Sequence, residues 1–260
     1  MLVADVLCTS YHGCDLAEVK EGDVVAIWGA GPIGLATAMW AKHLGARRVI
    51  VIDKIADRLR VAREKLGCDT LNYEASSEDV VTRLAALVPG GPDVCIECAG
   101  SRYAKSWTHA VMKAVKLETD AGDTLSEIMR ACRKGGRVAL IGDFIGWVNG
   151  YPSARSSLLL TLGHALTCAR VWKPVGAQME KGLTVRGGQL WTHRDWKLAV
   201  DKLVDGSLDA SWLVTHKVSL ADASAGYQGA HFSVLLMACS LLTPAPHQSL
   251  MTSTKGRSRS

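Results

Sequence analysis

The stretch that most constrains the fold of this chain runs from Val24 to Asp53. It contains an apolar run, the turn Gly29-Ala30-Gly31-Pro32-Ile33-Gly34, an apolar stretch with helical spacing, and a second apolar run. This order is typical of a βαβ unit that binds a dinucleotide. Gly29 would allow the tight turn after the strand, Gly31 would let a pyrophosphate approach the backbone, and Gly34 would let the helix lie close to the sheet.

The start of the helix and the end of the second strand carry the candidate binding groups. Pro32 and Ile33 occupy the first helical positions, where unpaired N–H groups and the positive end of the helix dipole favour an anion. Asp53 follows Gly34 by nineteen residues, a position from which a carboxylate can bind an adenosine ribose. Because this acid would repel a 2′-phosphate and is followed by Lys54, we expect NAD rather than NADP. The alternative is a glycine-rich turn in another kind of α/β protein with an unrelated acid downstream.

The rest of the chain continues the alternation of strands and helices. We predict a helix within residues 1–17, and further helices at Ile55–Leu66, Ser76–Leu87, Thr124–Cys132, Gly176–Gly182 and Trp191–Val204. The further strands are predicted at Asp69–Asn72, Val94–Cys98, Arg137–Ile141 and Leu183–Val185. This spacing predicts an α/β fold with a doubly wound parallel sheet, the Rossmann fold, covered by helices on both faces.

Composition excludes several classes of function. The net charge of +5 comes from residues 151–173 and 233–260, which hold six Lys and Arg and no Asp or Glu, so we expect no nucleic-acid partner. Neither apolar run in these segments reaches the roughly 20 residues needed to span a bilayer, so we expect no membrane contact. Eight scattered cysteines and no recognisable signal peptide indicate a reduced, cytoplasmic protein. The C-x-x-C at Cys95–Cys98 ends an apolar strand, which favours packing over a redox or metal role.

Several segments together resemble one enzyme family. They are VADVLCTSYHG, the Gly29 turn, VIDKIADR, IECAGSRYAKSWTHAVMKAVKLETD, GRVALIGDFIG and MEKGLTVRGGQ. They are similar to the zinc-dependent medium-chain alcohol dehydrogenases, and most similar to the glutathione-independent formaldehyde dehydrogenase-like branch. The resemblance covers about residues 2–150 and 174–232, and Ser101–Asp120 is specific to that branch.

The resemblance implies further site residues and a missing part. It implies an N-terminal GroES-like catalytic domain, which holds zinc and is absent here, so that residues 1–17 would be its remnant hinge. Asp5 matches the third zinc ligand of the branch, but a catalytic zinc needs three protein ligands. The remaining residues carried over are Thr9 beside the nicotinamide, Arg58 at the adenosine ribose, and Ala99, Gly142 and Gly188 along the nicotinamide half of the cofactor. Of the histidines His12, His109, His164 and His216, only His12 lies next to the expected nicotinamide end.

The chain also departs from the family pattern. We expect an NAD-binding domain at 18–232, interrupted by an atypical insert at 151–173 and followed by an atypical, disordered tail at 233–260. Their foreign composition suggests a mis-spliced or mis-assembled transcript.

Three functions remain open on the sequence. The first is the NAD-binding domain of an oxidoreductase that transfers hydride from a small alcohol or hydrated aldehyde to NAD. The second is a catalytically silent NAD binder, which we favour for the chain alone because two of three zinc ligands are absent. The third is a subunit-contact fragment in a homo-oligomer formed through the late strands around Leu183–Gly188.

Overall fold

The computed structural model describes residues 2–100, 123–143, 176–215, 219 and 222. The branch-specific segment 101–120, the insert 151–173, the tail 233–260 and three of the histidines considered above lie outside these residues. Our expectations for them, and the domain boundaries at 17 and 232, remain predictions.

The centre of the fold is one six-stranded sheet with the order β3-β2-β1-β4-β5-β6, and each neighbouring pair is parallel. This confirms the predicted doubly wound sheet. The strands are β1 (Val24–Trp28), β2 (Arg48–Asp53), β3 (Asp69–Asn72), β4 (Val94–Glu97), β5 (Arg137–Leu140) and β6 (Thr184–Gly187).

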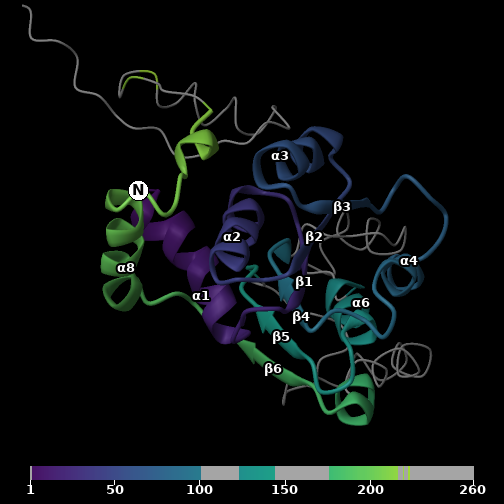
Figure 1. Ribbon diagram of the computed structural model, residues 1–260. Helices are drawn as coiled ribbons and strands as arrows, with labels where there is room; N and C mark the ends of the chain where they lie inside the picture. The colour runs from purple at the N-terminus through teal and green to yellow at the C-terminus, as the bar shows by residue number, and fades with distance from the viewer. Residues whose placement is uncertain (1, 101–122, 144–175, 216–218, 220–221, 223–260) are drawn as a thin grey trace, which may run out of the picture.

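Helices alternate with these strands along the chain and lie on both faces of the sheet (Figure 1). Residues 176–181 are also helical. The elements are η1 (Val3–Leu7), α1 (Cys8–Leu16), α2 (Pro32–His43), α3 (Ala56–Leu66), α4 (Val80–Leu87), α6 (Asp123–Ala131), α8 (Thr192–Val204) and η4 (Ser211–Leu213).

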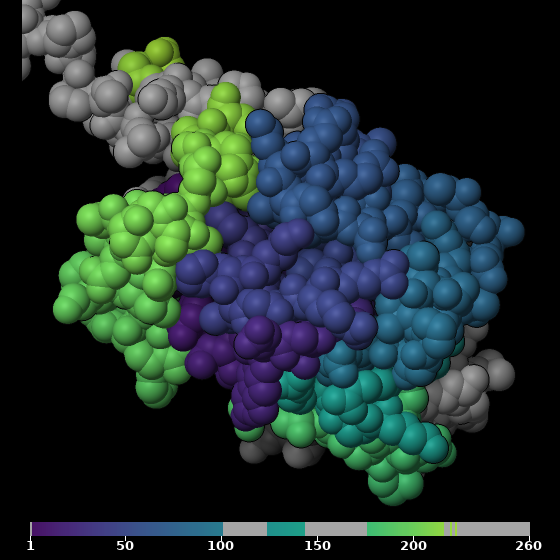
Figure 2. All heavy atoms as spheres, viewed as in Figure 1, coloured from purple at the N-terminus to yellow at the C-terminus, as the bar shows by residue number. Residues whose placement is uncertain are grey.

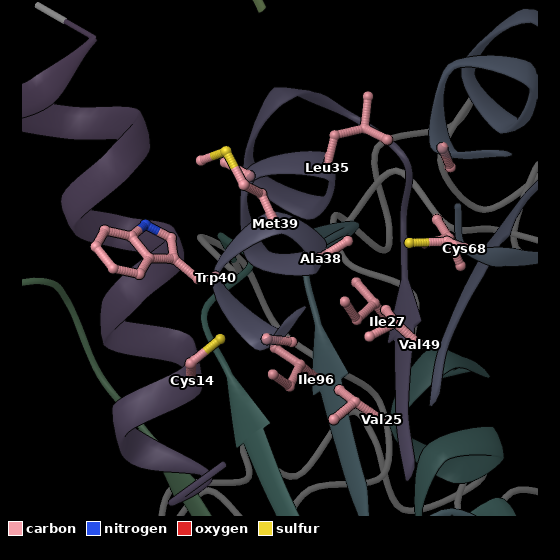
Figure 3. Close-up of a cluster of buried hydrophobic side chains, with 14 of the residues drawn as sticks. Cys14, Val25, Ile27, Leu35, Ala38, Met39, Trp40, Val49, Cys68 and Ile96 are labelled. Atoms are coloured by element: carbon pink, nitrogen blue, oxygen red, sulfur yellow. The ribbon is translucent and has the colours of Figure 1, made fainter. Parts of the chain in front are cut away.

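Alternate residues of the central strands bury their side chains in two separate cores. Val25 and Ile27 of β1 face the helices η1, α1, α2, α3 and α8, whereas Ala26 and Trp28 face α4 and α6. All five residues of β1 are buried, which explains why its sequence is continuously apolar rather than alternating. Figure 3 shows the first core, where Trp40 and Met39 of α2 lie between α1 and the strand residues Ile27 and Ile96.

The N-terminal helical segment belongs to the first core. Leu7, Cys8 and Cys14 are fully buried, and the Trp40 indole donates to the Leu7 carbonyl oxygen at 3.1 Å. The Tyr11 ring contacts the Trp40 ring edge-on at a centroid distance of 5.0 Å. Figure 2 shows this purple segment lying against the green residues of α8. The segment therefore stabilises the sheet domain by packing on it.

An ion pair joins Asp23, which precedes β1, to Arg137, the first residue of β5, at the end of the strands opposite the glycine turn. Arg137 Nη2 donates to both carboxylate oxygens of Asp23 at 2.7 Å, and the two side chains are only 14% and 11% exposed. Asp23 also accepts from the Lys20 backbone N–H at 2.7 Å. Charge-assisted hydrogen bonds between partly buried groups are worth more than exposed ion pairs.

We expect Asp23→Asn to lower the free energy of unfolding by about 1.5–3 kcal/mol, because the Arg137 guanidinium loses a charged partner at a mostly buried site. Urea denaturation would measure this loss. The matched control is Glu64→Gln, which breaks the exposed pair with Arg60 (58% and 53% exposed) and should cost less than ~0.5 kcal/mol. Equal effects of the two substitutions would contradict the assignment.

The C-x-x-C sequence contributes to both cores. Cys95 packs in the core beneath α4 and α6, whereas Cys98 packs against the opposite core, and both are free thiols. Since their side chains contact different faces of the sheet, the C-x-x-C sequence serves packing, as predicted.

Among the helices that the structure describes, none combines the length and the apolar composition that a membrane crossing requires.

Candidate functional site

The predicted cofactor residues meet at the carboxyl edge of the parallel sheet. Backbone hydrogen bonds continue each ladder past the strand ends: Gly29 N–H donates to Ile52 O at 2.8 Å and Cys98 N–H to Trp28 O at 2.8 Å. Next along the edge, Gly142 N–H donates to Glu97 O at 3.2 Å, and Gly188 N–H donates to Leu140 O at 3.3 Å. The turns after β1, β4, β5 and β6 therefore form one row.

After β1 the chain enters α2 on one face, and after β4 it reaches α6 on the other, so the reversal of strand order falls between β1 and β4. Ligands of open α/β sheets bind at such a point.

The three glycines of the turn differ in what surrounds them. Gly29 has a φ of +101°, a conformation that L side chains rarely adopt. A Cβ on Gly34 would lie 1.8 Å from the Gly29 carbonyl oxygen, so helix α2 and the turn touch backbone to backbone. A Cβ on Gly31 would meet nothing within 4 Å. Of these three glycines, only Gly31 has open space around it, and it is the position where the sequence predicts a pyrophosphate.

Helix α2 begins beside this open space. Gly31 is its N-cap and supplies no side chain to accept a hydrogen bond, and Pro32 is the first helical residue. The first N–H groups of a helix have no partner within it, and they lie at the positive end of the helix dipole. Pro32 and Ile33 are half-buried. The backbone therefore fits an anionic group at Gly31, as the motif predicts.

Asp53 closes the other side of the turn. Its side chain is 8% exposed, and one oxygen accepts from the Ala30 N–H at 2.7 Å. The other accepts from Lys54 N–H at 2.7 Å and Ile55 N–H at 2.9 Å. Sequence reasoning missed these backbone bonds, by which the carboxylate fixes the glycine turn. Each carboxylate oxygen has about two lone-pair sites, so the three backbone N–H groups do not use all the acceptor sites of Asp53. The role of Asp53 toward a ribose stays a prediction.

The remaining predicted residues lie around the same edge. Arg58 is in the first turn of α3, half-buried, and among the described residues its Nε has no hydrogen-bond partner. Ala99 follows β4 and is half-buried, as is Gly142 after β5, while Gly188 after β6 is exposed. Thr9 lies on α1, where its hydroxyl is 3.3 Å from an Asp5 carboxylate oxygen.

The structure adds a residue that the sequence reasoning did not select. Glu97, the last residue of β4, is completely buried. Its Oε1 accepts from the N–H groups of Ala99 at 2.8 Å and Gly100 at 2.7 Å, and its Oε2 accepts from Gly142 N–H at 3.2 Å. The pKa of Glu97 is raised from 4.5 to about 7: burial is the largest cause, the three N–H donors act against it, and the charge of Asp143 adds a smaller rise. A charged residue ending the apolar run Val94-Cys95-Ile96 was the available signal.

The predicted metal residue is not part of a metal centre within the described part of the chain. There, no three His, Cys, Asp or Glu side chains gather closely enough to hold an ion. Asp5 is exposed and accepts its hydrogen bond from Thr9. The residues described do not by themselves fit a catalytic zinc, which requires three protein ligands.

His12 is buried within a charged cluster between α1 and α8. It is 7% exposed, and its Nδ1 lies 3.3 Å from Arg194 Nη2. Arg194 also pairs with Asp15 at 2.9 Å and with Asp195 at 2.6 Å. Burial, followed by the nearby Arg194 charge, lowers the pKa of His12. This arrangement gives His12 a place in the contact between α1 and α8.

Comparison with known proteins agrees with this geometry. Residues 32–118 match the family model described as zinc-binding dehydrogenase. A zinc-type alcohol dehydrogenase-like protein of Schizosaccharomyces pombe is 38% identical over 227 residues, which cover 87% of this chain and 48% of the relative. The chain thus spans about half the length of that relative.

Solved structures give the same result. The alcohol dehydrogenase TADH from Thermus sp. ATN1 has a TM-score of 0.68 and 27% identity, with 90% of this chain and 55% of that chain covered. A dehydrogenase structure from Sinorhizobium meliloti 1021, bound to NADP, has a TM-score of 0.63 and 26% identity, with 85% and 53% covered.

Proposed function

We propose that this chain, which is similar to the zinc-binding dehydrogenases, is the NAD-binding domain of an alcohol dehydrogenase-like oxidoreductase. The observation that carries the proposal is the contrast within one turn. The Gly29 backbone occupies the space where a side chain on Gly34 would lie, while the space at Gly31 is open in front of the α2 N-terminus. A dinucleotide pyrophosphate is the group that this combination suits.

The orientation of the dinucleotide follows from what flanks the turn. The β2 side offers the Asp53 carboxylate and the unpartnered Arg58 Nε, which suit the adenosine ribose. The β4 and β5 side offers Ala99 and Gly142, where the nicotinamide would lie. When bound, NAD supplies a hydride acceptor, and the residues of this chain hold its two halves in place across the switch point.

The proposal extends to substrate only through the resemblance to the formaldehyde dehydrogenase-like branch. For the whole protein we propose hydride transfer from a small alcohol or hydrated aldehyde. For this chain alone we propose NAD binding without turnover, because Asp5 is the one matched zinc ligand and a substrate oxygen needs a metal held by three. Zinc analysis after dialysis and an assay with NAD⁺ and formaldehyde test this; stoichiometric zinc with NADH production that Asp5→Ala abolishes would overturn it.

Cofactor choice gives the sharpest test of the binding proposal. We expect Asp53→Asn to reduce the preference for NADH over NADPH by about ten- to a hundredfold, because it removes the charge that repels a 2′-phosphate and weakens hydrogen bonds worth roughly 1.5–3 kcal/mol. Asparagine retains one oxygen acceptor for the turn, which makes this change milder than Asp53→Ala.

Calorimetric titration of both proteins with both cofactors measures the ratio of dissociation constants. Circular dichroism spectra of the two proteins check that the turn has not unfolded. If the wild-type chain binds neither NADH nor NADPH, the proposed function fails. If it binds both and the ratio is the same in Asp53→Asn, the role of Asp53 is wrong.

A further inference from the structure

Glu97 connects two turns that follow different strands. Ala99 and Gly100 belong to the turn after β4, and their N–H groups point to one oxygen of the carboxylate. Gly142 belongs to the turn after β5, and its N–H points to the other oxygen. A single buried carboxylate therefore bridges three backbone donors across two neighbouring strands.

The two turns are also packed backbone against backbone. A Cβ on Gly142 would lie 2.1 Å from Glu97 Oε2 and 2.5 Å from the Gly100 nitrogen. A Cβ on Gly100, which has a φ of +58°, would lie 2.7 Å from the Asp143 carbonyl oxygen. Close packing prevents the two turns from moving toward each other, and the hydrogen bonds to Glu97 keep them from moving apart.

We propose that Glu97 is a positioning residue for the nicotinamide ring of the cofactor, because its buried carboxylate ties the turn of Ala99 to the turn of Gly142. The proposal rests on the proposed NAD-binding function. Glu97 acts through these two turns, and the adenosine half, held at Gly31 and Asp53 on the other side of the switch point, does not depend on it.

The chemistry of the carboxylate defines the diagnostic substitution. An ionised carboxylate offers acceptors on both oxygens, which the three N–H donors require. In Glu97→Gln, the amide oxygen can keep Ala99 and Gly100, but the amide NH₂ then faces the Gly142 N–H, donor against donor. The Gly142 turn is released while side-chain size and burial stay the same.

The experiment compares two ligands that differ by the nicotinamide ring, since ADP-ribose keeps the adenosine, the pyrophosphate and the second ribose. NADH and ADP-ribose are titrated calorimetrically into the wild-type chain and into Glu97→Gln. We expect the dissociation constant for NADH to rise about tenfold or more, the equivalent of one lost charge-assisted hydrogen bond, while that for ADP-ribose changes less than about twofold. The control is Glu127→Gln, the same change at a buried glutamate of α6 that accepts from the Trp28 indole at 3.2 Å; it should leave the ratio of the two constants unchanged.

A pH series on the wild-type chain tests the same idea without a mutation. Within the described part of the chain, Asp143 and Cys98 are the titratable groups whose charge couples to Glu97, and the adenine is common to both ligands. The ratio of NADH to ADP-ribose affinity should rise between pH 6 and pH 8, as Glu97 becomes ionised.

The outcomes separate the two proposals. If the wild-type chain binds neither ligand, the NAD-binding function fails. If it binds both, but Glu97→Gln weakens both equally or neither, the positioning role is overturned. If the variant does not fold, the pH series decides, and a ratio that is flat between pH 6 and pH 8 overturns the role.

Discussion

Gly34→Ala is expected to destabilise the fold by at least about 3–5 kcal/mol, a large fraction of the total stability of a typical domain. The added Cβ would lie 1.8 Å from the Gly29 carbonyl oxygen and 2.9 Å from its carbonyl carbon. Both obstacles are backbone atoms, so no side-chain rotation relieves the clash. Helix α2 would have to move off β1, which would disrupt the core that contains Leu35, Ala38 and Met39.

The matched control is Gly31→Ala, three residues earlier in the same turn. Gly31 has φ −70° and ψ −179°, an extended conformation open to any residue, and its Cβ would meet nothing. We expect its free energy of unfolding to stay within about 1 kcal/mol of wild type, since only chain entropy changes. Urea denaturation followed by circular dichroism measures both variants. Equal stability of the two would contradict the close approach at Gly34.

The arrangement of the sheet could be predicted because its information is local. Strands β1 and β3 begin and end as predicted, β2 ends at the predicted Asp53, and β4, β5 and β6 end within one or two residues of their predicted ends. Helix α4 begins at Val80 rather than at the predicted Ser76. The Ser76 hydroxyl accepts from Glu78 N–H at 3.1 Å, and Asp79 is extended, so a local turn delays the helix.

The Glu97 contact in the candidate site and the ion pair at the opposite end of the sheet could not be predicted, because they join residues far apart in the chain. Glu97 Oε2 and the Gly142 N–H are separated by 45 positions, and Asp23 and Arg137 by 114. The sequence showed Glu97 only as an acid at the end of an apolar strand. The helix in residues 1–17 was predicted as a remnant of a preceding domain, and its burial of Leu7 and Cys14 depends on α2 and α8, which sequence periodicity does not pair with it.

The second large effect is a pH dependence of stability that comes from Glu97. Its pKa is raised from 4.5 to about 7 in the folded chain, first by burial and then by Asp143. The folded state therefore binds the Glu97 proton more tightly than the unfolded state. This contribution to stability is fully present below pH 4.5 and is lost as pH rises through 7. A difference of this size amounts to about 3 kcal/mol.

The comparison of wild type with Glu97→Gln isolates this contribution. His12 acts in the opposite direction, because burial lowers its pKa, so the stability of neutral His12 is lost as pH falls. Both proteins contain His12, and its effect cancels in the difference between their unfolding free energies. Guanidinium denaturation at pH 4.5, 6 and 8 measures the difference between the unfolding free energies of wild type and Glu97→Gln. The difference should shift by about 3 kcal/mol in favour of the variant by pH 8, since wild type alone must ionise a buried acid. For the control Glu64→Gln at an exposed site, the unfolding free energy should change with pH in parallel with that of wild type. If the unfolding free energy of Glu97→Gln also changes in parallel, the Glu97 carboxylate does not titrate between pH 4.5 and 8 in the folded chain.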